Sequence, residues 1–166
     1  MARSRAVRVT IAVALLGSAA WGWYRGGVAT AGTTYDATVI ETIDGDTVVV
    51  RFDDGVVDTV RLLGVDTPET HHPDRPVECY GPEASEYTRS RLLGQRVVLE
   101  RDVESRDVYG RFLAYVRIDG ARFNDELLRL GYARLLIIPP NGEHGRAMLD
   151  AELEAEHHSL GLWSAC

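Results

Sequence analysis

Short runs of β-branched and apolar residues, separated by turn signals, are the feature that most constrains this fold. Asp53-Asp54-Gly55 is typical of a hairpin turn between two such runs, because Asp and Gly tolerate positive φ. Five short strands in this order predict a small five-stranded Greek-key barrel in a fold of the α+β class. The expected strands are residues 35–43, 47–52, 56–65, 96–101 and 112–118.

Three helices are expected to pack outside this barrel. Pro82 suits the first turn of one helix, and Asn124 is expected to cap the next. Leu149, Leu153 and Leu160 are expected to lie along one face of the last helix. The expected helices are residues 81–94, 124–131 and 142–159.

The composition excludes several classes of protein. A chain of 166 residues with 45% hydrophobic and 26% charged residues can bury a sizeable core in a single domain. This balance excludes intrinsic disorder, a collagen-like repeat and a multi-span membrane protein. All 18 basic residues are arginine and the formal net charge is −7, which argues against nucleic-acid binding through a broad basic face.

Residues 1–31 have the pattern of an export signal. Arg3, Arg5 and Arg8 precede an apolar run over residues 9–20, and small residues offer cleavage sites after it. A retained N-terminal membrane anchor is the main alternative, because tryptophans follow the run, and a buried helix is a third. Either main case places the domain, residues 35–166, outside the cytoplasm, secreted or on the outer face of the membrane. Without its four N-terminal arginines the chain has a formal charge of −11 instead of −7, so local charge must hold any polyanion.

Carboxylates gather at two predicted strand ends. Asp44 and Asp46 flank Gly45, a pattern that an ordinary tight turn also fits. Asp66 and Glu69 follow an apolar run at a spacing that lets both face one point. Paired carboxylates together with a backbone oxygen suit a hard divalent cation such as Ca²⁺ or Mg²⁺.

Two arginines complete this set of charged residues at predicted strands and turns. Arg61 lies inside an apolar run, where burying its charge costs several kcal/mol unless an anion meets it. Arg111 follows a turn and directly precedes a predicted strand. Two arginines can capture one phosphate group by paired hydrogen bonds. With a metal ion and a carboxylate that activates water, this set of groups predicts phosphodiester hydrolysis.

Four separated motifs resemble those of the staphylococcal nuclease (thermonuclease) family, in the family's order, over residues 35–163. The resemblance implies an OB-fold barrel and a Ca²⁺-dependent nuclease that cleaves DNA and RNA and leaves 3′-phosphates. The motifs are Asp44-Gly45-Asp46-Thr47, Arg61-Leu62-Leu63-Gly64-Val65-Asp66-Thr67-Pro68-Glu69-Thr70, Tyr80-Gly81-Pro82-Glu83-Ala84-Ser85 and Tyr109-Gly110-Arg111.

The resemblance also implies roles for the charged residues. Asp46, Asp66 and the carbonyl of Thr67 would hold the Ca²⁺, with Asp44 just outside its direct ligands. The catalytic residues would be Glu69, which positions or deprotonates the attacking water, and two phosphate-binding arginines. These arginines are Arg61 and Arg111.

The substrate-binding residues depart from the family pattern. Val108 stands where the family has a lysine, whereas Tyr109 is kept and is expected to contact substrate. Residues 135–138 are apolar where the family has tyrosines, and are expected to form a buried strand or, alternatively, a hydrophobic docking patch. Because stacking on an aromatic ring contributes ~1–3 kcal/mol per base, weaker or differently placed substrate binding is expected.

The expected partner is nucleic acid, both DNA and RNA, with single-stranded or denatured substrate preferred. The protein is expected to be a monomer. If the N-terminus is not cleaved, it would tether the protein to the membrane. One alternative function is a non-catalytic OB-fold module that binds nucleic acid. Another is a Ca²⁺-stabilised structural domain of the cell surface.

Cys79 and Cys166 are the two cysteines of the chain. We expect a disulfide that ties the C-terminal segment to the barrel, with two free thiols or an intermolecular bridge as alternatives. His71 and His72 are expected in a loop that contacts substrate, with a catalytic or metal-binding role as the alternative. Trp163 is expected to fill the core.

Overall fold

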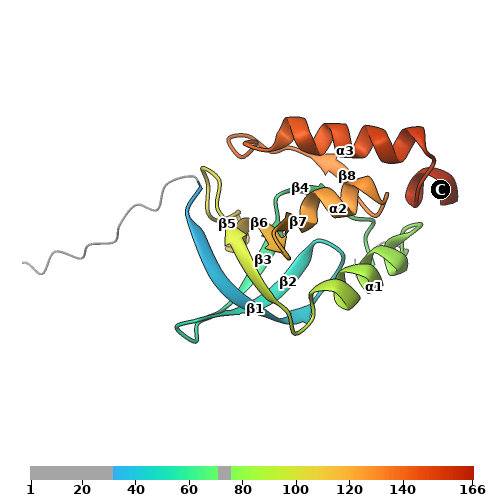
Figure 1. The fold of residues 1–166 in the computed structure, drawn as a ribbon. Helices are drawn as coiled ribbons and strands as arrows, with labels where there is room; N and C mark the ends of the chain where they lie inside the picture. The colour runs from blue at the N-terminus through green and yellow to red at the C-terminus, as the bar shows by residue number, and fades with distance from the viewer. Residues whose placement is uncertain (1–31, 71–75) are drawn as a thin grey trace, which may run out of the picture.

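A closed five-stranded β-barrel forms the body of the computed structural model, which describes residues 32–70 and 76–166 (Figure 1). β1 pairs antiparallel with β2 and β5, β2 with β3, and β5 with β6. A parallel pairing of β3 with β6 closes the barrel, which confirms the predicted OB-fold. The five strands are β1 (Thr34–Thr42), β2 (Thr47–Phe52), β3 (Val57–Leu62), β5 (Arg96–Glu100) and β6 (Phe112–Ile118).

The strand expected over residues 56–65 is divided in two. β3 ends at Leu62, and Gly64 with φ of 73° turns the chain into β4 (Gly64–Asp66). A Cβ at Gly64 would lie 2.5 Å from the methyl carbon of Met148, so the Met148 side chain would have to shift, and the positive φ itself favours glycine. β4 leaves the barrel and pairs with β8 (Arg134–Leu136), which brings Asp66 to the end of the barrel.

Four helices accompany the barrel in the described residues: α1 (Gly81–Leu92), α2 (Phe123–Arg129), α3 (Gly145–His157) and the short α4 (Leu162–Ala165). A two-residue strand, β7 (Ala121–Arg122), pairs antiparallel with the end of β6 and precedes α2. Figure 1 shows α3 lying across α2 on one side of the barrel, with α4 near the start of α1. None of the described helices combines the length and the apolar content that crossing a membrane requires.

Asn124 does not cap α2, so that prediction is wrong. Arg122 precedes the helix, and Asn124 is fully buried within its first turn. Its side-chain oxygen accepts a hydrogen bond from the Val116 N–H at 2.8 Å, and its amide nitrogen donates to the Leu63 carbonyl at 2.8 Å. The side chain therefore joins α2 to β6 and to the bend after β3.

The buried face of α3 is not the predicted leucine face. The helix buries Met148, Ala151 and Ala155, whereas half of Leu153 is exposed. Small residues suit this face because α3 packs closely on α2, and the expected leucine stripe points elsewhere.

The expectation for Trp163 is also wrong. Leu162 is the buried residue of α4, and Trp163 is half-buried, with the guanidinium of Arg134 4.4 Å from its ring centroid. Its neighbour Leu162 donates a backbone hydrogen bond to the Gly131 carbonyl at 2.9 Å, which fixes α4 to the end of α2.

Buried Asp102 joins the end of β5 to the segment before α3. It accepts hydrogen bonds from the Tyr115 hydroxyl at 3.0 Å and from the N–H groups of Gly142 at 2.8 Å and Glu143 at 3.0 Å. Burial alone would raise the pKa of Asp102, but these hydrogen bonds hold that pKa below its usual value.

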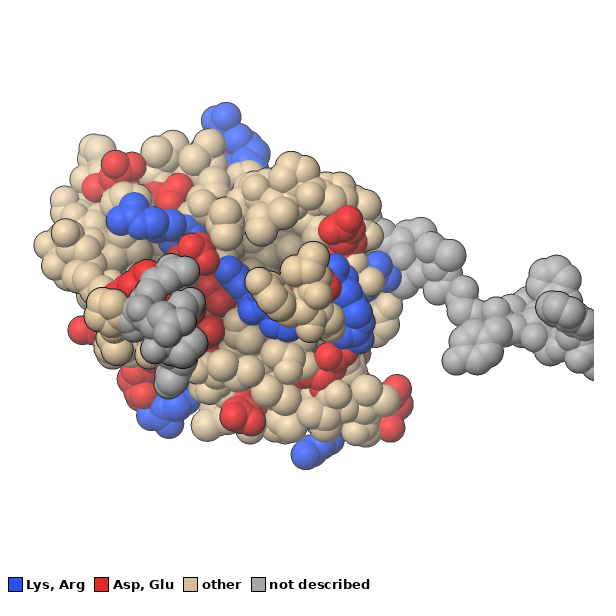
Figure 2. All heavy atoms as spheres, turned by 180° about the vertical axis from the view of Figure 1, so that it is seen from behind, with Lys and Arg blue, Asp and Glu red and all other residues tan. Residues whose placement is uncertain are grey.

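Arginine supplies the cation in the ion pairs of the described residues, with one histidine pair, His144 with Glu100, as the exception. On the face in Figure 2, arginines lie among acidic and uncharged side chains and form no continuous basic surface. This distribution agrees with the acidic composition.

Candidate active site

One small cavity, which we call the charged cavity, contains the residues to which the family resemblance assigns metal binding and catalysis. It has a volume of about 210 Å³ and is bordered by the turn between β1 and β2, the segment after β4 and the turn before β6. The lining residues are Asp44, Asp46, Arg61, Asp66, Thr67, Pro68, Glu69 and Arg111.

Gly45 allows the turn that carries Asp44 and Asp46 to pack closely against neighbouring residues. A Cβ at Gly45 would lie 2.7 Å from the Thr67 side chain, so no larger residue fits without displacement. The Gly45 carbonyl accepts a hydrogen bond at 2.7 Å from the hydroxyl of Thr88 on α1, and Asp46 N–H donates to Asp44 Oδ1 at 3.0 Å. The segment is a tight turn, as the sequence pattern also indicated, and these contacts hold both carboxylates in fixed positions.

Asp46 is buried and its two carboxylate oxygens have separate partners. Oδ2 accepts the Thr67 N–H at 2.9 Å, and Oδ1 accepts the Thr47 hydroxyl at 3.1 Å. Oδ2 also lies 3.2 Å from Nη2 of Arg61. These contacts orient the carboxylate before any ligand binds.

Arg61 projects from β3 between two carboxylates. Its Nη2 lies 3.2 Å from Asp46 and 3.1 Å from Asp66. Its Nη1 donates to the carbonyls of Leu62 at 2.8 Å and Val65 at 2.7 Å. The bend at Gly64 turns these carbonyls toward the guanidinium, and the side chain is only 15% exposed.

Arg111 is held by Asp107, a residue to which the sequence analysis gave no role. Arg111 Nε donates to Asp107 Oδ2 at 2.7 Å, and the backbone N–H of Arg111 donates to Oδ1 at 2.9 Å. Although burial raises the pKa of Asp107, the hydrogen bonds from Arg111 lower it below its usual value. The spacing of four residues within one turn was the signal that could have identified Asp107.

Glu69 is held through its backbone. Its N–H donates to Glu78 Oε2 at 3.1 Å, and its own carboxylate accepts the Thr70 N–H at 2.8 Å. Glu78 had no predicted role, and no local sequence signal connects positions nine residues apart.

The charged cavity contains more carboxylates than cations. Burial first, and then the charge of Asp46, raises the pKa of Asp44 to about 6. Burial also raises the pKa of Asp66, against the opposing effect of Arg61. Every side-chain donor to a metal in this cavity is an oxygen, and the cavity has an excess of negative charge. The donor set therefore fits a hard divalent cation such as Ca²⁺ or Mg²⁺.

A second acidic group lies outside this cavity. Glu100, Glu143 and His144 bring potential metal-binding atoms within 4.8 Å of one another. His144 Nε2 lies 2.8 Å from Glu100, and Arg117 donates to Glu100 at 3.3 Å. Although burial raises the pKa of Glu100, these two partners lower it below its usual value. These contacts explain the clustering of the three side chains as a structural link between β5, β6 and the start of α3.

A larger cavity of about 590 Å³ adjoins the charged cavity and shares Arg61 and Arg111 with it. Tyr109 and Val108 border it, 82% and 94% exposed. Its further lining residues are Leu62, Leu63, Gly64, Val65, Glu104, Arg106, Asp107, Leu113, Leu136, Ile138 and Asn141.

Residues 135–138 do not form a buried strand, so that prediction is wrong. β8 ends at Leu136, and Leu136 and Ile138 are 38% and 64% exposed along the larger cavity. Within residues 32–70 and 76–166, the sheet of β4 and β8 has two strands, and no third strand covers this edge.

The structure contains a disulfide between Cys79 and Cys166, with a Cα–Cα distance of 6.0 Å. The free-thiol alternatives therefore do not describe this structure. His71 and His72, and the signal or anchor expected over residues 1–31, lie outside the described residues.

The OB-fold barrel, with clustered carboxylates and two arginines at one end, fits the chemistry of phosphodiester hydrolases, and comparison with known proteins shows this enzyme class. The chain belongs to the staphylococcal nuclease family and is a nuclease. The model of the family described as staphylococcal nuclease homologue matches residues 59–165. The predicted family and enzyme class are thereby confirmed.

Curated relatives support the same membership. The thermonuclease of Staphylococcus intermedius is 46% identical over 121 residues, which cover 73% of this chain and 71% of the relative. The thermonuclease of Staphylococcus hyicus is 42% identical over 126 residues, covering 76% and 74%. A prophage-derived endonuclease of Bacillus subtilis is 40% identical over 131 residues, covering 78% of this chain and 44% of that protein.

Proposed function

We propose that this protein is a Ca²⁺-dependent nuclease that acts outside the cytoplasm and hydrolyses DNA and RNA to fragments with 3′-phosphate ends. The observation that supports this proposal is the charged cavity, where a carboxylate pair, Glu69 and two fixed arginines meet. A phosphodiester needs these groups together because its hydrolysis combines water activation with stabilisation of developing negative charge.

Arg61 and Arg111 bind the scissile phosphate. Carbonyl groups fix Arg61, and Asp107 fixes Arg111, so neither guanidinium has to be ordered when substrate arrives. Their charges are then positioned to stabilise the extra negative charge on the phosphate oxygens in the transition state.

Glu69 accepts the proton of the attacking water. As the water oxygen bonds to phosphorus, the P–O5′ bond breaks and the 5′ oxygen takes up a proton from solvent. The products are a 3′-phosphate and a 5′-hydroxyl. Glu69 then returns its proton to solvent, so the enzyme is unchanged after the reaction.

Asp46, Asp66 and the carbonyl of Thr67 would hold the Ca²⁺, with Asp44 beside them. When bound, the ion would supply Lewis-acid charge stabilisation at the phosphate. The buried Asp46 keeps its orientation through Thr47 and Thr67, which prepares the carboxylate for the ion.

Tyr109 is the aromatic residue at the larger cavity and stacks a base of the substrate. Stacking requires unpaired bases, so we propose that the enzyme, as a monomer, prefers single-stranded or denatured DNA and RNA. The domain would span residues 35–166 and follow a signal or anchor over residues 1–31. The disulfide supports an oxidising location, because disulfides persist outside the cytoplasm.

The test incubates the purified protein with denatured DNA and with RNA, in Ca²⁺ and then in chelator. Cleavage is expected only with Ca²⁺, and a polymerase should extend the DNA fragments only after phosphatase treatment exposes their 3′ ends. Ca²⁺ should also raise the melting temperature, which reports binding without activity.

Glu69→Gln and Arg111→Ala should each lower kcat by about 10²- to 10³-fold, because they remove the proton acceptor and a phosphate ligand. Glu86→Gln and Arg146→Ala are matched controls at exposed helix positions and should keep full activity. Unchanged activity in either active-site variant would contradict its role. Substrate retention without cleavage would instead favour a non-catalytic binding module.

A further inference from the structure

Glu69 and Glu78 contact each other in both directions. The Glu69 N–H donates to the Glu78 carboxylate at 3.1 Å, and the Glu78 N–H donates to the Glu69 carbonyl at 2.9 Å. Glu78 is not among the residues that line the charged cavity, and the hydrogen bond of its carboxylate is to the backbone of the segment that carries Glu69. The backbone position of Glu69 therefore depends on a residue nine positions later.

The start of α1 contacts the same segment. A Cβ at Gly81 would lie 3.0 Å from the Pro68 carbonyl oxygen and 3.1 Å from that of Glu69. Gly81 N–H also donates to the Glu78 carbonyl at 3.0 Å. Residues 78–81 thus form one side of the support for Glu69.

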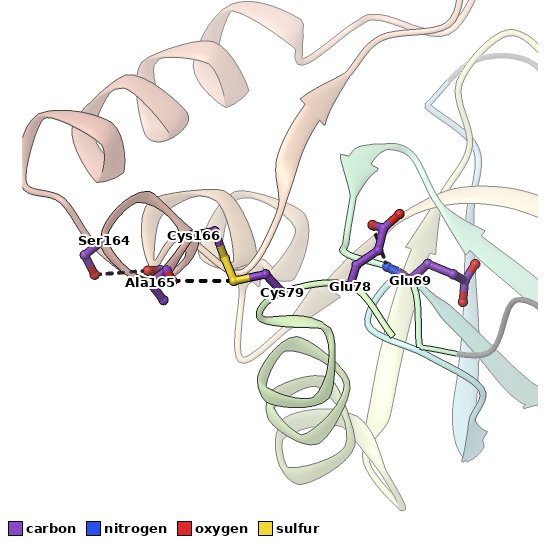
Figure 3. The surroundings of a disulfide bond; sticks show 7 residues. Glu69, Glu78, Cys79, Ser164, Ala165 and Cys166 are labelled. Atoms are coloured by element: carbon purple, nitrogen blue, oxygen red, sulfur yellow. Dashed lines mark hydrogen bonds between the residues drawn. A yellow bond between two sulfur atoms is a disulfide. The ribbon is translucent and has the colours of Figure 1, made fainter. Parts of the chain in front are cut away.

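The disulfide connects this support to the C-terminal helix. Cys79 directly follows Glu78, and its partner Cys166 lies at the end of α4, 87 positions later (Figure 3). Figure 3 shows Glu69, Glu78 and Cys79 in succession on one side of the bond, and Ala165 and Cys166 on the other.

The C-terminal side of the disulfide is itself immobilised by packing. A Cβ at Gly161 would lie 2.3 Å from the Gly131 carbonyl oxygen, so the two backbones are in direct contact. Leu162 is 2% exposed and donates to the same carbonyl. Cys166 therefore offers a fixed point to which Cys79 is attached.

We propose that Glu78 is a positioning residue for Glu69, and that the Cys79–Cys166 disulfide keeps Glu78 in place, so that catalysis depends on the redox state of this bond. The inference rests on the proposed role of Glu69 as proton acceptor. Its chemistry is that of a fixed hydrogen-bond acceptor: the Glu78 oxygen holds the Glu69 N–H, and the disulfide limits the movement of that oxygen.

The first test compares Glu78→Ala with Glu78→Gln. Alanine removes the acceptor and should lower kcat by about 10- to 100-fold, as expected for displacement of a catalytic group by about 1 Å. KM should change little, because Arg61 and Arg111 do not contact Glu78. Glutamine keeps an oxygen acceptor without the charge, so it should restore most of kcat. Unchanged kcat with alanine, a loss confined to KM, or equal losses with both variants would overturn the positioning role.

The second test removes the disulfide with Cys79→Ser and Cys166→Ser together, and compares this variant with the oxidised and reduced wild-type protein. Folding is checked by near-ultraviolet circular dichroism, and the barrel-core substitution Val50→Ala controls for lowered stability alone. A several-fold loss of kcat is expected, and it should not multiply with the loss from Glu78→Ala, because both act on one contact. Wild-type kcat in the folded, disulfide-free protein would overturn the role of the bond.

Amide hydrogen exchange at Glu69 tests the inference without any assay of activity. Exchange should accelerate in Glu78→Ala and on reduction, but not in Val50→Ala. Unchanged exchange in Glu78→Ala would overturn the inference even if the enzyme is active. A wild-type protein that cleaves nothing would refute the proposed function, whereas this measurement would still decide the role of Glu78. If the disulfide-free variant does not fold, the comparison of alanine with glutamine at Glu78 decides.

Discussion

The charged cavity and the larger cavity meet at Arg61 and Arg111 but are built in different ways. In the charged cavity, backbone groups and partly or fully buried side chains hold most of the functional groups, as Thr67 N–H does for Asp46 and Asp107 does for Arg111, although the Asp66 side chain is 58% exposed. In the larger cavity, three of the lining residues are highly exposed: Val108 at 94%, Tyr109 at 82% and Ile138 at 64%.

This difference separates chemistry from substrate binding. A group that takes a proton or stabilises a transition state must hold its position closely, and the backbone contacts of the charged cavity provide that. An exposed side chain can be exchanged without disturbing the fold, and three residues at which a departure from the family pattern was expected, Val108, Leu136 and Ile138, line the larger cavity. Changes in the charged cavity should therefore alter kcat, and changes in the larger cavity should alter KM.

Among the substitutions that test this contrast between the cavities, the largest effect is expected from Gly45→Ala. The new Cβ would approach the buried Thr67 side chain to 2.7 Å, so the turn must shift and displace the carboxylates on either side. We expect kcat to fall by about 100-fold, because displacements of about 1 Å have effects of that size. Steady-state kinetics in saturating Ca²⁺ measure the loss.

Gly145→Ala is the matched control for this substitution. Its Cβ would lie at 3.5 Å from Ile137, an ordinary van der Waals distance, at the first residue of α3. Kinetics should stay at the wild-type level. Equal activity of the two alanine variants would show that the charged cavity tolerates displacement, and the contrast between the cavities would be lost.

A smaller effect is expected from Tyr109→Ala. Loss of one stacking ring should raise KM about tenfold, within the ~1–3 kcal/mol range for a stacked base, and leave kcat nearly unchanged. Tyr109→Phe keeps the ring and should behave as wild type. A fall in kcat at constant KM would instead place Tyr109 in the catalytic step, through its ring contact with Arg111 at 5.5 Å.

Asp102→Asn should have the smallest effect on activity and a measurable effect on stability. Asp102 binds the N–H groups of Gly142 and Glu143 next to Asn141, which borders the larger cavity. Its pKa in the folded state is below the usual 3.8, so its carboxylate stabilises the fold at neutral pH, and this contribution is lost as the pH falls through that lowered pKa.

We therefore expect Asp102→Asn to reduce the unfolding free energy at pH 7 by about 1–3 kcal/mol. The difference in unfolding free energy between wild type and variant should shrink below about pH 4. Urea unfolding at several pH values measures this. A constant difference from pH 7 to pH 3 would contradict the assignment to the Asp102 carboxylate, and a large loss of kcat would contradict the separation of the two cavities.

The sequence predicts best those elements whose local pattern and tertiary environment agree. Residues 47–52 and 112–118 form β2 and β6 with the expected bounds, because each is a β-branched or apolar run with turn signals beside it. The charged residues were also expected to converge, because strand ends of a small barrel lie close together, and one cavity contains them.

Predictions failed where packing overrides a local pattern. Asn124 has the side chain of a helix cap, but its amide satisfies two backbone groups of distant segments. The face of α3 that carries Ala151 and Ala155 is buried because α2 lies close to it, and the spacing of the leucines does not reveal that neighbour. The role of Glu78 could not be predicted for the same reason: its contact with Glu69 forms because the chain returns to the end of the barrel just before α1.

The use of arginine in nearly all described ion pairs has a consequence for alkaline solutions. A lysine would lose its charge near pH 10.4, whereas arginine keeps its charge beyond pH 12. Burial first, and then hydrogen bonds to Glu126 and Asp102, raises the pKa of Tyr87 and Tyr115 above the ordinary 10.0. Because the unfolded chain releases these phenolic protons more readily, stability declines once the pH passes about 10. These tyrosines, together with Tyr80, whose pKa is also raised, therefore lower stability in alkaline solution even though the arginines keep their charge.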